Sequence, residues 1–355
     1  MRDLKALPKA HLHLHFTGSM RIETLCELAA EQGIRLPENF TDNVALHVPA
    51  NQRGWFRFQR AYDAARKVVR SETAMRRIVR EAAEDEAREG SRRLEIQIDP
   101  TSYAPFVGGI TPALEIVLDE AVLAQRDTGV QIGVIVAASR MKHPLDAAIL
   151  ARLAAKHAGE GAGCVVGFGL SNDERRGVTA EWEKAFRIAH KAGLAAVPHG
   201  GELLGPQHIR QVVEYLHPQR LGHGVRAAED PKLLAYIVDH SIALEVCPAS
   251  NVQLGIYQHL GDVPLRTLLQ AGAQIALGAD DPLLFRSRLV AQYENARHAL
   301  GFDDYELAAL AHSSINATLA APSDKQRWHS EIDAWLRAPE TATSTLTGNH
   351  TYVCN

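Results

Sequence analysis

Short apolar runs and longer stretches with helical periodicity alternate along the chain. A short apolar run bounded by turn residues is typical of a buried strand, and each run here is followed by apolar residues at helical spacing. The runs lie near residues 10–15, 92–98, 130–137, 164–170, 195–199, 220–223, 243–246 and 275–277. The pattern therefore predicts eight strand–helix units.

This alternation favours a parallel sheet covered by helices, because strands that are almost continuously apolar are buried on both faces. Several helical stretches end in glycine just before the next strand, where glycine closes a helix. Eight such units predict an α/β fold, a closed (β/α)8 TIM barrel. An open doubly wound sheet is the alternative. No GxGxxG motif follows a strand, which speaks against a dinucleotide site.

Two segments stand outside the repeat. Residues 20–70 are too many for one connection, so we expect extra helices there, over the mouth formed by the carboxyl ends of the strands. The aromatic cluster in this segment either covers the mouth as a lid or packs a helix onto the barrel: Trp55, Phe56, Phe58 and Tyr62. Residues 338–355 are rich in Ser, Thr and Ala, so we expect one domain over 1–337 followed by a loose tail.

Composition narrows the class of protein. The 355 residues carry a net charge of −4, and no block of like charge predicts a nucleic-acid or membrane partner. No segment reaches the roughly 20 apolar residues that a membrane span needs. The four cysteines form no CxxC pair, and we interpret them as free thiols in a reducing compartment. A cytoplasmic protein is therefore expected.

The stretch KAHLHLHFTGS at residues 9–19 carries three histidines at alternate positions. Alternate side chains of a strand share one face, so His11, His13 and His15 are expected to point the same way. Two of them at the end of a strand can bind one metal ion. Histidines that each bond a carbonyl are the ordinary explanation of an isolated pair, so the pair needs further ligands nearby.

Polar, titratable residues follow three other strands. His199 and Glu202 stand in VPHGGE, His223 in RLGHG, and Asp280 and Asp281 in GADDP. The carboxyl ends of barrel strands surround one mouth, where active sites lie. We therefore expect these side chains to meet His13 and His15 in one pocket.

Three imidazoles and a carboxylate suit Zn²⁺ or another divalent transition metal. A catalytic metal lowers the pKa of a bound water towards neutrality, and hydrolysis then needs a proton acceptor and an acid. His223 and Glu202 are the two candidates that remain for these roles.

Four motifs resemble the adenosine deaminase family of the amidohydrolase superfamily, in this order: LPKAHLHLHFTGSM, HGGE, RLGHG and GADDP. The similarity spans roughly residues 7–336 and includes VVGFGLSNDE and CPASN. The resemblance implies hydrolytic loss of the 6-amino group of a purine nucleoside, a small-molecule substrate. It implies one Zn²⁺ held by these residues: His13, His15, His199 and Asp280.

The resemblance also implies roles for the remaining polar residues. Glu202 would protonate purine N1, which makes C6 electrophilic. His223, assisted by Asp280, would help to activate and orient the attacking water. Asp281 would hydrogen-bond N7.

Departures from the family pattern bear on the substrate. Adenosine deaminases carry an acid that binds the 5′-hydroxyl where this chain has Thr17, which predicts a larger 5′ group, apolar or anionic. Asn172 replaces a glycine whose N–H contacts N3, Gln97 replaces a more usual Arg, and His11 replaces a more usual Glu. We interpret His11 as a supporting residue.

The motif HFTGSM resembles the branch that deaminates 6-aminodeoxyfutalosine, a menaquinone precursor whose 5′ end carries a carboxyphenyl group. Adenosine and 5′-deoxy-5′-methylthioadenosine are the alternative substrates. Four arginines are candidates for contact with an anionic end: Arg21, Arg57, Arg60 and Arg140. Each one alone is more typical of an ordinary surface.

Two other functions were weighed against deamination. Ester or amide hydrolysis on the same barrel predicts a carboxylated Lys after a middle strand, and LSNDE offers none at the fourth strand. A non-catalytic binding protein predicts the loss of a ligand or of the acid, and all of them are present.

Overall fold

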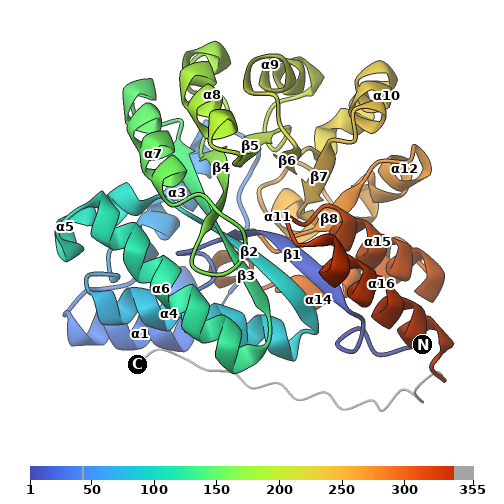
Figure 1. Ribbon diagram of the computed structural model, residues 1–355, viewed down its shortest axis with the longest axis horizontal. Helices are drawn as coiled ribbons and strands as arrows, with labels where there is room; N and C mark the ends of the chain where they lie inside the picture. The colour runs from blue at the N-terminus through green and yellow to red at the C-terminus, as the bar shows by residue number, and fades with distance from the viewer. Residues whose placement is uncertain (42–43, 340–355) are drawn as a thin grey trace.

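Eight parallel strands form the centre of the molecule (Figure 1). The computed structural model describes residues 1–41 and 44–339. The strands pair in chain order: β1 Lys9–His15, β2 Ser91–Ile98, β3 Gln131–Ser139, β4 Val165–Ser171, β5 Ala195–Gly200, β6 Arg220–His223, β7 Ala243–Val246 and β8 Ile275–Leu277. Each strand matches a predicted apolar run to within two residues.

The end of β8 returns to β1 and closes the barrel. Asp280 N donates to His13 O at 3.0 Å, and His15 N donates to Asp280 O at 3.1 Å. The fold is therefore a (β/α)8 barrel, as the sequence predicts, and the open sheet is wrong. The same two hydrogen bonds fix Asp280 beside the two histidines of β1.

Helices surround the strands (Figure 1). In the first half of the chain they are α1 Ile22–Glu31, α2 Glu38–Thr41, α3 Gln52–Arg66, α4 Glu72–Arg88, α5 Ala104–Val107, α6 Ile110–Thr128 and α7 Pro144–Lys156. In the second half they are α8 Glu183–Lys191, α9 Pro206–Leu216, α10 Pro231–Asp239, α11 Pro248–Gln253, α12 Leu265–Gln270, α13 Pro282–Phe285, α14 Leu289–Ala299, α15 Asp304–Asn316 and α16 Pro322–Arg337. The 3₁₀ helices are η1 Pro100–Ser102, η2 Thr179–Trp182, η3 Val225–Glu229 and η4 Leu260–Asp262. Three helices, α1 to α3, make up the extra segment expected between β1 and α4.

A charged network crosses the interior of the barrel. Arg220 of β6 is 2.6 Å from Glu95 of β2 and 2.6 Å from Glu245 of β7, and Arg93 is 2.8 Å from Glu95. Strands β2 and β6 are not neighbours, so these side chains meet across the barrel. Burial alone would raise the pKa of Glu95, but the charges of Arg220 and Arg93 outweigh it and lower that pKa to about 2.

Cys164 and Cys247 carry free thiols, as expected, but Cys26 forms a disulfide, so the prediction of a free thiol there is wrong. Cys354 lies outside the described residues, as does nearly all of the predicted tail over 338–355. The boundary of the domain at 337 and the cytoplasmic location stay predictions.

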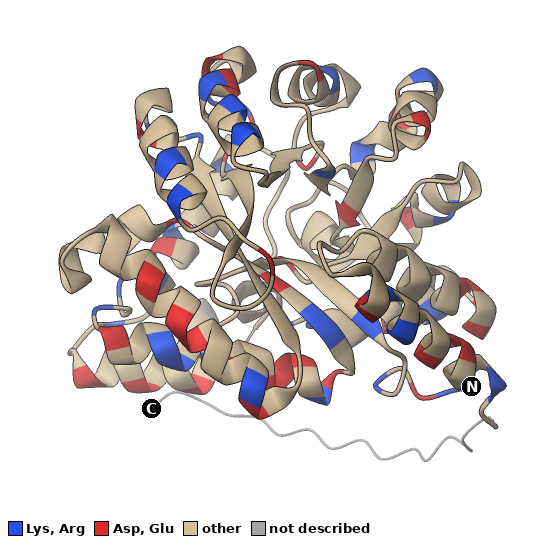
Figure 2. Ribbon diagram, viewed as in Figure 1, with Lys and Arg blue, Asp and Glu red and all other residues tan. Residues whose placement is uncertain are grey.

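Charged groups are spread over the outer helices. Positions of Lys and Arg and positions of Asp and Glu are interspersed along the ribbon in Figure 2. No described helix is both long enough and apolar enough to cross a membrane.

Candidate active site

A cavity of about 250 Å³ opens at the carboxyl ends of the strands. Its inner end is lined by five of the residues that sequence analysis singled out: His15, His199, Glu202, Asp280 and Asp281. Trp55, Phe58 and Tyr62 of α3 form one wall. The added helix therefore covers the mouth, whereas Phe56 of the same aromatic cluster is exposed.

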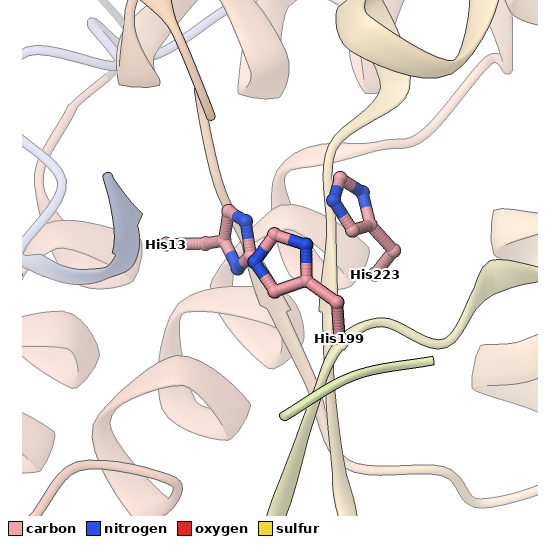
Figure 3. Close-up of side chains that lie close together, drawn as sticks. All are labelled: His13, His199 and His223. Atoms are coloured by element: carbon pink, nitrogen blue, oxygen red, sulfur yellow. The ribbon is translucent and has the colours of Figure 1, made fainter. Parts of the chain in front are cut away.

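Three buried imidazoles from three strands lie against one another beside the cavity (Figure 3). The ring of His13 is 4.8 Å from that of His199 and 4.7 Å from that of His223, centroid to centroid. Nε2 of His13 and both ring nitrogens of the other two have no hydrogen-bond partner. Buried polar atoms are nearly always paired, so these nitrogens are suited to binding a cation.

Asp280 supplies the carboxylate of this group. Its Oδ1 is 3.2 Å from His15 Nε2 and 3.5 Å from His13 Nε2, and its Oδ2 accepts from Ser250 Oγ at 2.7 Å. Burial raises the pKa of Asp280, but its hydrogen bonds to the two histidines outweigh burial and hold that pKa well below its usual value. The carboxylate is therefore ionised.

Burial lowers the pKa of His13, but Asp280 and Glu245 outweigh it and raise that pKa to about 9. A cation bound at His13 Nε2 would take the place of the proton that the raised pKa favours on this imidazole. Three overlapping groups of ligand atoms lie within 4.8 Å of one another: His13, His199 and His223; His13, His15 and Asp280; Glu202, His223 and Asp280. No single group joins all four predicted ligands. The first two groups share His13 and together contain all four.

Glu245 positions His13. Its Oε2 is 2.7 Å from His13 Nδ1, so Nδ1 carries the hydrogen and Nε2 is left free to face Asp280. A hydrogen bond of this kind fixes the tautomer and the orientation of a metal-ligating histidine. The sequence does not reveal Glu245, because its contact with His13 depends on the register of β7 against β8 and on the closure of β8 onto β1.

Glu174 holds the loop that carries Glu202. The Glu174 carboxylate accepts from the backbone N–H groups of Glu202, Leu203 and Leu204 at 3.0, 2.9 and 2.8 Å. Glu174 belongs to VVGFGLSNDE, but sequence analysis gave it no role. The three bonds fix the backbone from which Glu202 projects into the cavity.

Burial disfavours the ionised form of both Glu202 and Asp281. Burial, together with the charges of Asp280 and Glu174, raises the pKa of Glu202 well above its usual value. Burial and Asp280 do the same to the pKa of Asp281, whose Oδ1 has no partner. Each can therefore donate a hydrogen bond or a proton. His223 is the opposite case, because burial lowers its pKa to about 3 and leaves the imidazole neutral.

Thr17 and Asn172 occupy different positions relative to the cavity. Thr17 is fully buried, its hydroxyl bonds Tyr103 Oη, and Tyr103 rather than Thr17 lines the cavity. Asn172 does line it, in the left-handed region at φ 77°, and its Oδ1 accepts from Asp173 N at 2.8 Å. Glycine favours this backbone region, and the bonded asparagine side chain is an alternative that tolerates it.

His11 does not share the environment of the other two histidines of β1. The register of β1 against β2 shifts between His11 and Leu14. His11 Nε2 accepts from Ala279 N at 2.9 Å, and its Nδ1 lies 2.7 Å from Glu86 in α4. The expectation that all three point the same way is therefore wrong.

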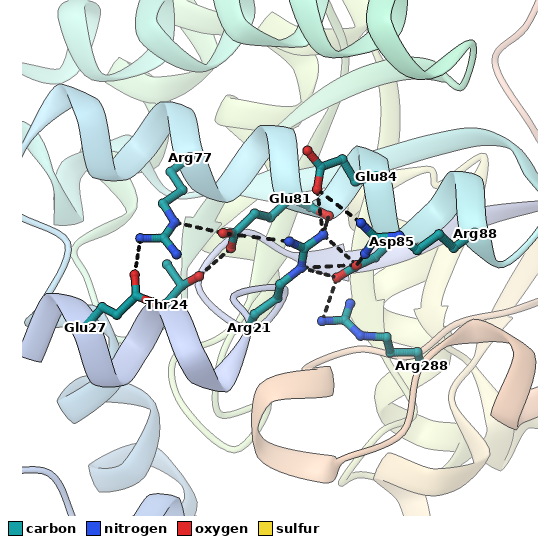
Figure 4. Close-up of polar contacts among 9 residues, drawn as sticks. All are labelled: Arg21, Thr24, Glu27, Arg77, Glu81, Glu84, Asp85, Arg88 and Arg288. Carbon is teal, nitrogen blue, oxygen red and sulfur yellow. Dashed lines mark hydrogen bonds and ion pairs between the residues drawn. The ribbon is translucent and has the colours of Figure 1, made fainter. Parts of the chain in front are cut away.

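The arginines expected near the mouth do not line the cavity: Arg21, Arg57, Arg60 and Arg140. Arg21 lies in a network of ion pairs between α1 and α4, where its Nη2 is 2.7 Å from Asp85 (Figure 4). Two other cations, Arg66 and Lys142, line the partly exposed outer end instead.

The sequence model of the family described as adenosine deaminase matches residues 8–335. The chain belongs to the adenosine deaminase family. A Streptomyces virginiae protein, whose name provisionally calls it an adenosine/adenine deaminase, is 58% identical over 94% of this chain and 98% of its own length.

Solved structures agree with this family. The crystal structure of an adenine deaminase from Arthrobacter aurescens superposes with a TM-score of 0.85 and 28% identity, covering 94% of this chain and 100% of the other. A zinc-bound amidohydrolase of Burkholderia ambifaria shares the fold at TM-score 0.81 and 23% identity, covering 94% and 93% of the two chains.

Proposed function

We propose that the chain is a zinc-dependent aminohydrolase that converts an adenine nucleoside to the 6-oxo nucleoside and ammonia. The observation that carries the proposal is the inner end of the cavity, where unpartnered imidazole nitrogens adjoin carboxyl groups whose pKa burial raises. The name of the Streptomyces relative supports the reaction class.

The donor set fits zinc. His13, His15, His199 and Asp280 would hold the ion, and Glu245 would orient His13. When bound, zinc lowers the pKa of a water molecule towards neutrality and so makes it a stronger nucleophile.

The protein's own groups supply the proton transfers. Glu202 gives its proton to purine N1, which makes C6 more electrophilic, and protonated Asp281 donates its O–H to N7. His223 and Asp280 orient the attacking water and accept its proton. The water oxygen adds at C6, the proton taken from the water passes to the amino group, and the C6–N bond breaks to release ammonia. The remaining hydroxyl proton passes to the Glu202 carboxylate as the carbonyl forms at C6.

For the 5′ end we propose a group larger than a hydroxyl, with 6-aminodeoxyfutalosine as the first substrate. The outer cavity offers an aromatic wall on α3 and two cations, Arg66 and Lys142, for an aryl carboxylate. Lys142 now pairs with Asp99 at 2.8 Å, and Asp99 has a second partner in Thr101 N at 3.0 Å. Adenosine and 5′-deoxy-5′-methylthioadenosine are the alternative substrates.

The test is ammonia release by zinc-loaded enzyme from these three compounds side by side. We expect kcat/KM for 6-aminodeoxyfutalosine to exceed the others by orders of magnitude. A preference for adenosine would contradict the 5′ assignment and leave the deaminase standing. No ammonia from any of the three would contradict the proposed function itself.

A further inference from the structure

Gln97 is a buried polar residue of the cavity whose side chain has no hydrogen-bond partner. It lies near the end of β2, is 1% exposed and lines the cavity, yet neither Oε1 nor Nε2 finds a partner among the described residues. Such groups are rare, because a buried amide has lost its hydration and gained nothing in exchange. The amide is therefore available to a ligand.

The small residues Gly169 and Ala137 leave room for the side chain of Gln97. A Cβ built on Gly169 of β4 would lie 3.5 Å from Gln97 Oε1 and 3.4 Å from the Cβ of Ala137 in β3. The amide thus extends from β2 towards β4 along the inner wall. Gln97 pairs in register with His15 at the inner end of the cavity, and Asp99, two residues on, lines the outer part. The amide therefore stands between the reacting end and the outer end.

The chemistry of an amide limits what can satisfy it. It offers a donor and an acceptor side by side, and a hydroxyl is the simplest group that both donates and accepts. If the proposed function holds, Glu202 and Asp281 serve N1 and N7 of the base, and the next group along the cavity is the sugar.

We propose that Gln97 binds a sugar hydroxyl of the nucleoside and so makes the enzyme select nucleosides over free adenine. This inference rests on the proposed function and deepens it. It bears on a choice that the names of the relatives leave open, because they include both adenosine and adenine.

The experiment compares zinc-loaded wild type with Gln97→Met, a change that keeps the length of the side chain and removes both polar atoms. kcat/KM is measured on adenosine, 2′-deoxyadenosine, 3′-deoxyadenosine and adenine. We expect the wild type to favour adenosine over one of the deoxynucleosides by about tenfold to a hundredfold. In Gln97→Met that ratio should fall to about one, with turnover of adenine unchanged.

Gln125→Met is the matched control, because Gln125 lies on α6 outside the barrel, where its amide oxygen accepts from Ile132 N at 2.9 Å. It should keep the wild-type ratios. Dissociation constants for inosine, 2′-deoxyinosine and 3′-deoxyinosine give the same comparison if Gln97→Met turns over too slowly.

Two results would overturn the role of Gln97. One is a ribo-to-deoxy ratio that Gln97→Met leaves unchanged. The other is an equal loss on adenine and adenosine, which would assign the amide to the edge of the base. Failure of the proposed function looks different, because the wild type would then release ammonia neither from these compounds nor from 6-aminodeoxyfutalosine.

Discussion

Glu202 is suited to act as an acid because its surroundings favour the protonated form of its carboxyl group. It is buried, Asp280 and Glu174 add negative charge nearby, and its pKa is raised well above the usual value. A carboxyl group in an open, solvated position would ionise at neutral pH and could not donate to N1.

Glu202→Gln should therefore keep zinc and lose activity. We expect kcat/KM to fall by about 10²- to 10⁴-fold, since an amide cannot transfer a proton to N1. Zinc content by atomic absorption and the melting temperature serve as controls, and both should match the wild type. Full activity in a variant that retains its zinc would sink the assignment of the acid.

Glu245 offers a second test at this scale. Removing its charge with Glu245→Gln weakens the hold on His13 Nδ1, and we expect zinc affinity to fall by about 10- to 100-fold. Competition with a chelator measures this change. Glu183→Gln, on the partly exposed surface of α8, is the control with unchanged affinity. Equal affinities in the two variants would show that Glu245 does not support the metal.

Some residues of the site could be predicted from their place in the sequence, and others could not. His199, Glu202 and Asp281 could be predicted because each follows an apolar run, and barrel topology alone brings those ends together. Glu245 and Glu174 could not, because their partners depend on register and on loop conformation. Both are buried carboxylates, and no sequence motif links either of them to the group that it binds.

At the scale of elements, β1 shows how one irregularity redirects a residue. Strict alternation would put His11, His13 and His15 on one face, but the shift in register turns His11 to Glu86 of α4. A bulge has no reliable sequence signal when no glycine marks it. Short helices such as α11 and α13 were missed for a related reason, since four to six residues cannot display helical periodicity.

Helix α4 holds α1 and the segment before α14 through one carboxylate. Asp85 is 2.7 Å from Arg21, 2.9 Å from Arg88 and 2.9 Å from Arg288 (Figure 4). Arg21 follows directly on the loop after β1, and Arg288 lies before α14. The network therefore ties both segments to the same turn of α4.

Arg21→Met should destabilise the fold without changing substrate preference. We expect a loss of about 1–3 kcal/mol in the free energy of unfolding, because charged hydrogen bonds to a nearly buried carboxylate are lost. Denaturant titration measures it, and Arg126→Met, in a fully exposed pair with Asp127, should show no measurable change. If Arg21→Met kept wild-type stability but lost activity on 6-aminodeoxyfutalosine alone, Arg21 would instead contact the substrate.

For the whole molecule, the sequence was most informative about topology. Eight apolar runs separated by helical stretches allow few arrangements, and right-handed strand–helix connections lead to a closed barrel. What the pattern could not reveal is the charged interior, because Arg93, Glu95 and Arg220 read as polar residues within otherwise apolar strands. Arg220 of β6 pairs with Glu95 of β2, a strand far away in the sequence, so only the closed barrel brings these two together.

This interior network should make stability fall in acid. Glu95 has a pKa of about 2 in the folded barrel, against about 4.5 when unfolded, so its ionised form favours folding by roughly 3 kcal/mol. Because the folded pKa is the lower one, this contribution is complete above about pH 4.5 and is lost as the pH falls towards 2. Glu95→Gln should remove it, so its free energy of unfolding should depend less steeply on pH between 2 and 5 than that of the wild type. Denaturant titrations across that range measure both slopes, with Glu183→Gln on the partly exposed surface of α8 as the control that keeps the wild-type slope. Parallel slopes for wild type and Glu95→Gln would mean that the pairing with Arg220 and Arg93 does not set the acid stability of the barrel.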